Sequence, residues 1–194
     1  MNAVLAFTTF ILQATLVTVF DFSETEAIDA WTVVNDGVMG GVSEGLWYQE
    51  DDYAVFEGEI SLDNNGGFSS VRLGFRAVDL SGYDGFALTV RGDGQQYAFG
   101  IRDVASRYDH RLTFETTAVG AEADLDDPAT WETIYIPFDD LTPTFFGREN
   151  LSAAPLETRG VRGLNLIISD EQVGAFRIEI ASIALYSEDD SAAT

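Results

Sequence analysis

The 194-residue sequence contains no cysteine and no lysine, and His110 is its single histidine. Without cysteine the chain can form neither a disulfide nor a thiolate nucleophile, and one histidine cannot form a His-pair metal site. We therefore expect no metal site and no cofactor. All ten basic residues are arginines, and they face 33 acidic residues, which gives a formal charge of -23.

This acidic balance excludes several classes of partner. A surface of this charge repels phosphate backbones and anionic lipid, so we expect no nucleic-acid partner. The acid-rich, lysine-free composition is typical of halophilic proteins, which work at molar salt where the repulsion between acids is screened. The alternative is a merely acidic protein in ordinary cytosol.

The length and the hydrophobic content of 46% fit one domain. Residues 1–16 form an apolar N-terminal segment, residues 17–187 the domain, and residues 188–194 an acidic tail. No basic residue precedes Arg72, so the positive region of a signal peptide is missing, and several threonines weaken a membrane anchor. We expect no stable membrane span and a cytoplasmic location, with export by an atypical signal as the alternative.

Apolar residues alternate with polar ones along most of the chain, which is the period of a β-strand. The clearest alternation covers 71–75, 86–90, 97–101, 164–168 and 176–180, and further strand-like runs cover 47–56, 112–114 and 131–136. Gly92-Asp93-Gly94 is expected to join two of these runs as a hairpin. A capping box at Ser23–Glu26 predicts one short helix after it. Together these patterns predict an all-β fold, an antiparallel β-sandwich or jelly roll.

Two glycine-rich segments, 31–43 and 56–72, combine turn-forming Asn, Asp and Gly with single large apolar residues. A linker would be uniformly polar, so these loops are expected to pack and to hold a fixed shape. We expect the two loops to lie next to each other at one end of the sandwich.

Motifs for catalysis are weak. Gly92-x-Gly94 lacks the third glycine of a dinucleotide fingerprint, and Asp124-x-Asp126-Asp127 lacks the later Gly and Glu of a calcium loop. No nucleophile-elbow sequence surrounds any serine, and His110 is expected at the surface. We predict no catalytic residues.

Three arginines stand out because each falls on the side of its strand opposite the apolar positions: Arg72, Arg91 and Arg102. They are expected to share one face. Such a face offers either local salt bridges to neighbouring acids or a bidentate grip on a carboxylate, a phosphate or an acid of a partner.

Five segments carry a family resemblance. These are Asn-Asp-Gly-Val-Met-Gly-Gly-Val-Ser at 35–43, Asn-Gly-Gly-Phe-x-Ser-x-Arg at 65–72, and the segments 131–138, 146–148 and 168–183. They resemble the complex I intermediate-associated protein 30 family, assembly factors for respiratory NADH:ubiquinone oxidoreductase. The resemblance implies a galactose-binding-like β-sandwich, similar to non-catalytic carbohydrate-binding modules. It also implies a chaperone that holds a protein partner, such as a respiratory-complex subunit, and no enzyme.

The family motifs supply the candidate binding residues, which are Asn35, Asp36, Met39, Asn65, Arg72 and Arg148. The Asn and Asp residues could instead serve turn geometry alone, and Met39 could be a core plug rather than a contact at a loop tip. The chain has no Arg-rich transit peptide, which indicates a bacterial, stand-alone version.

The alternative function is a carbohydrate-binding module. It would need an exposed platform of aromatic side chains with a few hydrogen-bonding groups. The candidates for the platform are Trp47, Tyr48, Tyr53, Tyr83 and Tyr108.

Overall fold

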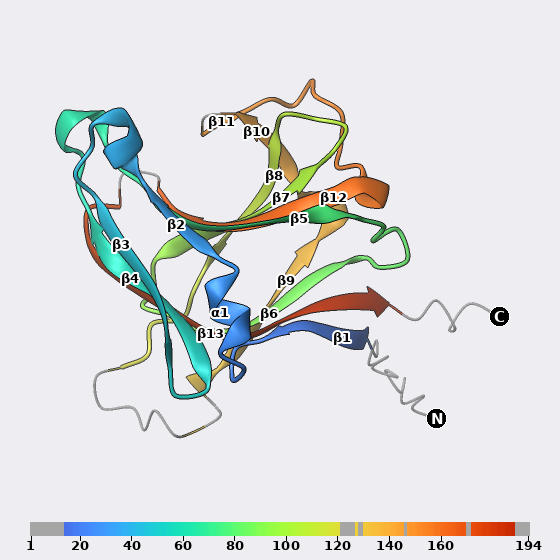
Figure 1. Ribbon diagram of the computed structural model, residues 1–194, viewed down its shortest axis with the longest axis horizontal. Coiled ribbons are helices and arrows are strands. Elements are labelled where there is room, and N and C mark those ends of the chain that lie inside the picture. Colours follow the sequence, from blue (N-terminus) through green and yellow to red (C-terminus); the bar gives the residue numbers. More distant parts are fainter. Residues whose placement is uncertain (1–13, 121–126, 128–129, 146, 170–171, 189–194) are drawn as a thin grey trace, which may run out of the picture.

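A computed structural model describes residues 14–120, 127, 130–145, 147–169 and 172–188. In this part of the chain two antiparallel β-sheets pack face to face, with one short helix beside them (Figure 1). The prediction of an antiparallel β-sandwich is confirmed. Residues 1–13, the Asp124–Asp126 part of the acidic loop and residues 189–194 lie outside the described residues.

The six-stranded sheet has the order β3-β4-β13-β6-β9, and β1 also pairs with β13. Its strands are β1 (Ala14–Asp21), β3 (Glu44–Glu50), β4 (Tyr53–Ile60), β6 (Gly85–Arg91), β9 (Glu132–Pro137) and β13 (Gly174–Glu188). The long strand β13 pairs with β4 along its first half and with β1 along its second half.

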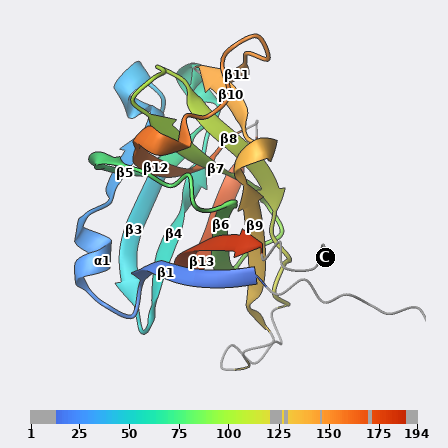
Figure 2. The same ribbon diagram turned by 90° about the vertical axis from the view of Figure 1, so that its right-hand side faces the viewer.

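The seven-stranded sheet has the order β11-β10-β8-β7-β12-β5-β2. Its strands are β2 (Thr32–Asn35), β5 (Ser69–Val78), β7 (Gln96–Asp103), β8 (Asp109–Glu115), β10 (Thr142–Phe145), β11 (Arg148–Glu149) and β12 (Val161–Ile168). Figure 2 shows the molecule from the side, with β1 and β13 at its lower edge and β10 and β11 at the top.

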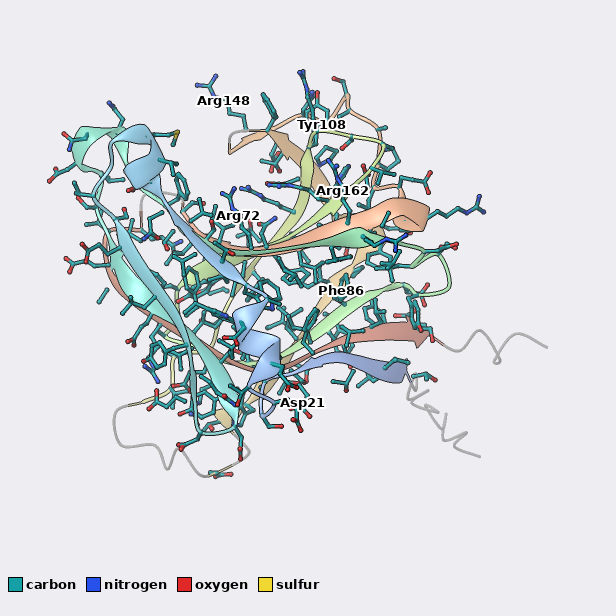
Figure 3. The ribbon with its side chains drawn as sticks, in the orientation of Figure 1. Asp21, Arg72, Phe86, Tyr108, Arg148 and Arg162 are labelled. Carbon is teal, nitrogen blue, oxygen red and sulfur yellow. The ribbon has the colours of Figure 1, made fainter. Side chains whose placement is uncertain are left out.

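The core fills the space between the two sheets because the central strands point their apolar positions inward. Phe86 from β6 meets Phe99 from β7 edge to face, with ring centroids 5.5 Å apart, and so joins the two sheets. Figure 3 shows Phe86 in the layer between them. Full burial of one such side chain contributes about 1.5–3 kcal/mol, so this layer supplies most of the driving force for folding.

Several local predictions need correction. Gly92-Asp93-Gly94 does not form a hairpin, because β6 and β7 belong to different sheets and the segment crosses between them. Asp93 stabilises this crossing by accepting hydrogen bonds from the Arg177 backbone N–H (2.7 Å) and the Tyr97 hydroxyl (3.1 Å). The run 47–56 is two paired strands, and Asp51 turns the chain between them with a positive φ of 47°.

The short helix α1 (Glu26–Asp29) is present where it was expected, but the capping box is wrong. Thr25 occupies the N-cap position without a side-chain hydrogen bond. The Ser23 hydroxyl instead donates to Asp21 Oδ1 at 2.8 Å. Ser23 therefore stabilises the turn after β1 rather than the helix.

The outer face of the six-stranded sheet carries an ion-pair network, which we call the Arg177 network. Arg177 on β13 pairs with Glu50, Glu57 and Glu179 at 2.6–2.8 Å, and the Tyr48 hydroxyl also accepts from it at 3.3 Å. Burial alone would lower the pKa of Arg177, but hydrogen bonds to these carboxylates hold it well above its ordinary value. Three carboxylates therefore share one cation.

Arg91 belongs to the same outer face, so the prediction that it shares a face with Arg72 and Arg102 is wrong. It pairs with Glu179 and is only 5% exposed. Its guanidinium lies 4.7 Å from the Trp131 ring centroid and 5.3 Å from that of Tyr53. It does point away from the core, as the alternation predicted, but from the other sheet.

The prediction of a surface position for His110 is also wrong, because its side chain is fully buried. His110 has the same parity on β8 as the inward-facing Leu112 and Phe114. Its Nε2 atom lies 3.2 Å from the Ala154 carbonyl oxygen, and its Nδ1 atom lies 4.0 Å from the buried Asp103 carboxylate. No helix among the described residues is long and apolar enough to cross a membrane.

Candidate functional site

The outer face of the seven-stranded sheet carries a row of polar side chains. Strand register places Arg72 on β5 opposite Asn165 on β12, Asn165 opposite Gly100 on β7, and Gly100 opposite Arg111 on β8. The neighbours of these residues along each strand, such as Leu73 and Leu164, point into the core. Because side chains alternate between the two faces of a strand, the row must point away from the core. We call it the Arg72–Arg111 row.

A glycine is required at position 100 because the Asn165 side chain occupies the space that a larger residue would need. A Cβ atom at residue 100 would lie 2.5 Å from Asn165 Nδ2, which is closer than such atoms approach in real structures. The missing side chain therefore lets the Asn165 amide extend over Gly100 of β7, between the strands that carry the two arginines.

Above the row the sheet face is hollowed. Two adjoining hollows of about 770 Å³ and 550 Å³ share Arg72, Arg102 and Arg162 in their walls, and we treat them as one site, the arginine hollow. Six of the ten arginines of the chain line it, and Asp109 is the one acid among the described residues of its walls. The six are Arg72, Arg76, Arg102, Arg107, Arg111 and Arg162. Figure 3 shows Arg72 and Arg162 on the same side of β5 and β12, below Tyr108.

Asp109 is the internal counter-ion of the hollow. It accepts from Arg102 Nε at 2.6 Å and from Arg111 Nη2 at 2.8 Å. Burial would raise the pKa of Asp109, but these two guanidinium groups hold it below the ordinary range. Asp109 therefore stays ionised at neutral pH and neutralises one of the six positive charges.

Arg72 has a different environment. Its Nε atom donates to the Ser70 hydroxyl at 3.0 Å, and no carboxylate among the described residues lies within ion-pair distance of it. Burial, followed by repulsion from Arg102, lowers the pKa of its guanidinium. An arginine in this situation gains from any anion that enters the hollow.

The floor of the hollow also contains polar atoms with no hydrogen-bond partner. Arg111 Nε and Asn165 Oδ1 are both buried, and neither has a partner among the described residues. Buried polar groups are normally satisfied, so these atoms offer one donor and one acceptor to a ligand.

The rim of the hollow is apolar. On the β2 side it is formed by Val38 and Met39, which are 74% and 60% exposed. On the β10 side it is formed by Phe145, over whose ring the Arg107 guanidinium lies at 4.9 Å from the centroid. Met39 is therefore exposed at a loop tip and is not a core plug.

Asp36 fixes the shape of the β2-side rim. Its fully buried carboxylate accepts from the backbone N–H groups of Ser43 (2.9 Å), Gly67 (2.7 Å) and Phe68 (3.3 Å). It thereby joins the two glycine-rich loops, and Figure 1 shows them side by side at one end of the molecule. A Cβ atom at residue 41 would overlap this carboxylate, which explains the glycine there. The predicted adjacency of the loops is confirmed.

The six residues proposed from the sequence thus take different positions. Met39, Asn65 and Arg72 line the hollow. Asn35 and Asp36 brace the loops behind it, Asn35 by accepting from the Ser69 hydroxyl at 2.7 Å. Arg148 is exposed at the tip of β11, outside the residues that line the hollow (Figure 3).

Sequence reasoning missed Arg111, Asn165, Arg162 and Phe145. The alternation along β8 could have placed Arg111 on the outer face, since Leu112 and Phe114 mark the inner one. Asn165 lies between Leu164 and Leu166 in an alternating run, which places it on the outer face too, but alternation gives no sign that it lies beside Arg72. No group of three or more His, Cys, Asp or Glu side chains in the described part of the chain is placed to hold a metal ion.

Comparison with known proteins gives a family match and a set of similar structures. A family model described as Complex I intermediate-associated protein 30 (CIA30) matches residues 20–180. The mitochondrial complex I intermediate-associated protein 30 of Mus musculus is 24% identical over 190 residues, which cover 88% of this chain and 56% of the mouse protein. The chain thus spans about half the length of this relative.

The similar solved structures include carbohydrate-binding modules. A family 11 module from Clostridium thermocellum, solved with a β-1,3-1,4-mixed-linked tetrasaccharide, aligns with a TM-score of 0.65 at 11% identity, covering 89% of this chain and 96% of the module. A family 30 module of a cellulosomal cellulase from the same organism aligns with a TM-score of 0.57 at 16% identity, covering 91% of this chain and 99% of the module. An agarase aligns with a TM-score of 0.61 at 13% identity, covering 89% of this chain but only 24% of the agarase. These likenesses show that the fold is the galactose-binding-like sandwich of such modules.

Proposed function

The chain belongs to the complex I intermediate-associated protein 30 family, and from this premise we propose that it is a non-catalytic module that holds a protein partner in the arginine hollow. The partner we propose is a subunit of a respiratory complex during its assembly. Both the family description and the mouse relative support an assembly role.

The observation that carries this proposal is the composition of the arginine hollow. Arginine, methionine and aromatic residues are enriched at protein–protein interfaces, and the hollow combines six arginines with Met39 and Phe145 at opposite rims. The chain has a net charge of -23, so a face that gathers six arginines differs in sign from the rest of the protein. That face therefore prefers partners with an acidic surface.

Site-specific photo-crosslinking in the native host tests the proposal. Met39→p-benzoylphenylalanine places the reactive group at the rim of the hollow. Leu46→p-benzoylphenylalanine is a matched control, because Leu46 is equally exposed, at 59%, but lies on β3 of the other sheet. We expect respiratory-complex subunits to crosslink to position 39 and not to position 46. Identical crosslinked products at both positions, or none at position 39, would contradict the proposal.

A carbohydrate ligand is the second candidate, and the shared fold with family 11 and family 30 modules favours it. The positions of the aromatic candidates for a sugar platform do not favour a carbohydrate ligand. Trp47 packs against Trp31 and Phe22, and Tyr48 and Tyr53 lie on the other sheet. Tyr83 is partly buried against the core, so of the five candidates only Tyr108, which packs edge to face on Phe145, lies near the hollow.

Calorimetry with the mixed-linkage tetrasaccharide separates the two candidates. Binding of a neutral sugar should change little with salt, whereas an arginine-dependent protein partner should dissociate as salt rises. Salt-insensitive binding that disappears in Phe145→Ala would favour the carbohydrate function.

A further inference from the structure

The two arginines at the ends of the Arg72–Arg111 row indicate which kind of ligand the hollow binds. The inference rests on the partner-holding function proposed above. We propose that the hollow binds an extended acidic segment of the protein partner, which runs across the strands. Two carboxylates of this segment, four residues apart, pair with Arg72 and Arg111.

Charge gives the first step. The described walls of the hollow carry six arginines against Asp109, and Asp109 is already shared by Arg102 and Arg111. Clefts lined by one sign of charge concentrate ligands of the opposite sign. The ligand is therefore an anion, and Arg72, which has no carboxylate within ion-pair distance in the described residues, is its first contact.

The unpartnered atoms give the second step. Arg111 Nε needs an acceptor, and Asn165 Oδ1 needs a donor. A carboxylate supplies the acceptor, and a backbone N–H group supplies the donor. A peptide offers both, whereas a fully ionised inorganic anion offers only acceptors, and a neutral sugar leaves the charge of Arg72 unpaired.

Strand geometry gives the spacing. Arg72 and Arg111 are separated by three strand-to-strand steps, from β5 through β12 and β7 to β8. At about 4.8 Å per step their Cα atoms are about 14 Å apart. An extended chain advances about 3.4 Å per residue, so residues four apart are also about 14 Å apart and point to the same side.

The rims give the flanking chemistry. Val38 and Met39 stand beyond the β5 end of the row and Phe145 beyond the β8 end. An acidic segment with an apolar residue outside each carboxylate would contact both rims. Apolar rims raise affinity without relaxing the charge requirement, because Arg72 gains no carboxylate, and Arg111 Nε no charged acceptor, if the acids are replaced.

Fluorescence anisotropy with the full chain tests this inference. The probe is a labelled nine-residue peptide with Glu at its third and seventh positions and Leu at both ends. We expect it to bind, to weaken as salt rises, and to lose about tenfold in affinity in Arg72→Gln and in Arg111→Gln. Arg159→Gln is the matched control, because Arg159 is an exposed arginine outside the hollow.

One variant should strengthen binding. Asp109→Asn is nearly isosteric and removes the internal counter-ion of Arg102 and Arg111, so it should bind the probe severalfold more tightly. A gain in affinity cannot come from partial misfolding, which makes this result decisive even if an arginine variant proves unstable.

Several results would overturn the inference. These are equal binding of a peptide with Gln in place of both Glu residues, equal binding of a peptide whose two Glu residues are adjacent, and complete displacement of the probe by inorganic phosphate at matched ionic strength. Tighter binding of an acidic oligosaccharide than of the peptide would assign the hollow to an anionic carbohydrate instead. If crosslinking from position 39 persists in the Arg72→Gln, Arg111→Gln double variant, the partner-holding function stands and only the acidic-segment inference fails.

Discussion

Asp36 offers the sharpest test of how the glycine-rich loops are held. Asp36→Asn keeps the shape of the side chain but replaces one carboxylate oxygen with an NH₂ group. An asparagine amide has a single acceptor oxygen, so its NH₂ group faces either Ser43 N–H at the Oδ1 position or Gly67 N–H and Phe68 N–H at the Oδ2 position, and at least one backbone donor loses its partner. The substitution therefore weakens the hydrogen bonding that holds the loops, without removing any apolar contact.

The size of the effect follows from these contacts. A hydrogen bond to a charged group contributes about 1.5–3 kcal/mol, and the Gly67 bond is short while the Phe68 bond is long at 3.3 Å. Loss of at least one of the three bonds, with weakening of the others when the charge is removed, should cost about 3 kcal/mol in the free energy of unfolding. For a domain of this size that lowers the thermal midpoint by about 6–12 °C at pH 7, measured by circular dichroism.

The pH dependence supplies an independent check. Burial raises the pKa of Asp36, but the hydrogen bonds to its carboxylate lower it by a larger amount. The net pKa in the folded protein is therefore below that of the unfolded chain. The stabilisation is therefore complete above the unfolded pKa of about 3.9 and is lost as the pH falls through the lower folded pKa. The difference in the free energy of unfolding between wild type and Asp36→Asn should narrow as the pH falls below about 4, since the contributions of carboxylates common to both proteins cancel.

Asp63→Asn is the control, because Asp63 is an exposed acid in the same pair of loops. It removes the same charge and should leave the midpoint within about 1 °C of wild type, as is usual for surface substitutions. A similar loss in both variants, or a gap for Asp36→Asn that does not change with pH, would refute the assignment of Asp36 as the connection between the loops.

Three further predictions follow from other parts of the structure. Gly100→Ala should displace the Asn165 amide and weaken binding of the acidic peptide. Gly82→Ala, which lies outside the hollow and where a Cβ atom meets open space, should not weaken it, and equal binding by both variants would contradict the role of Gly100. Arg177→Ala leaves the three carboxylates of the Arg177 network without their shared cation. It should lower the free energy of unfolding, measured with urea, by about 1–2 kcal/mol after solvent screening. The loss should be smaller at about 1 M salt, and Arg159→Ala is the control. If the charge of -23 is a salt adaptation, the thermal midpoint should rise from 0.05 to 2 M sodium chloride more than in an uncharged osmolyte, and a flat profile would contradict the halophilic interpretation.

The parts of the fold that depend on local pattern could be predicted from the sequence. Alternation identified the strands because one face of each strand is buried, and it correctly placed Arg72, Arg91 and Arg102 on outward-facing positions. The turn formers at 35–43 and 65–72 identified two packed loops, and Asp36 provides the physical reason for their adjacency.

The parts that depend on strand order could not be predicted in this way. Alternation tells which side of a strand is buried but not to which sheet the strand belongs, so Arg91 was assigned to the wrong face. The Arg72–Arg111 row could not be predicted for the same reason, because its residues come from four strands and lie up to 93 residues apart in the sequence. Only the register of the strands aligns Asn165 between residues 72 and 100.

The pairing of β1 with β13 has a practical consequence for anyone who shortens this protein. Residues 14–21 look like the end of a removable apolar leader, and the family match itself begins only at residue 20. A truncation that removes residues 14–21, or that starts the chain at residue 20, would remove all or most of β1. The second half of β13 would then be an open edge, with backbone N–H and C=O groups from Ser182 to Glu188 free to pair with another molecule. A shortened protein of this kind should be made with residue 14 or an earlier residue as its first, because the strand that looks dispensable closes one edge of the six-stranded sheet.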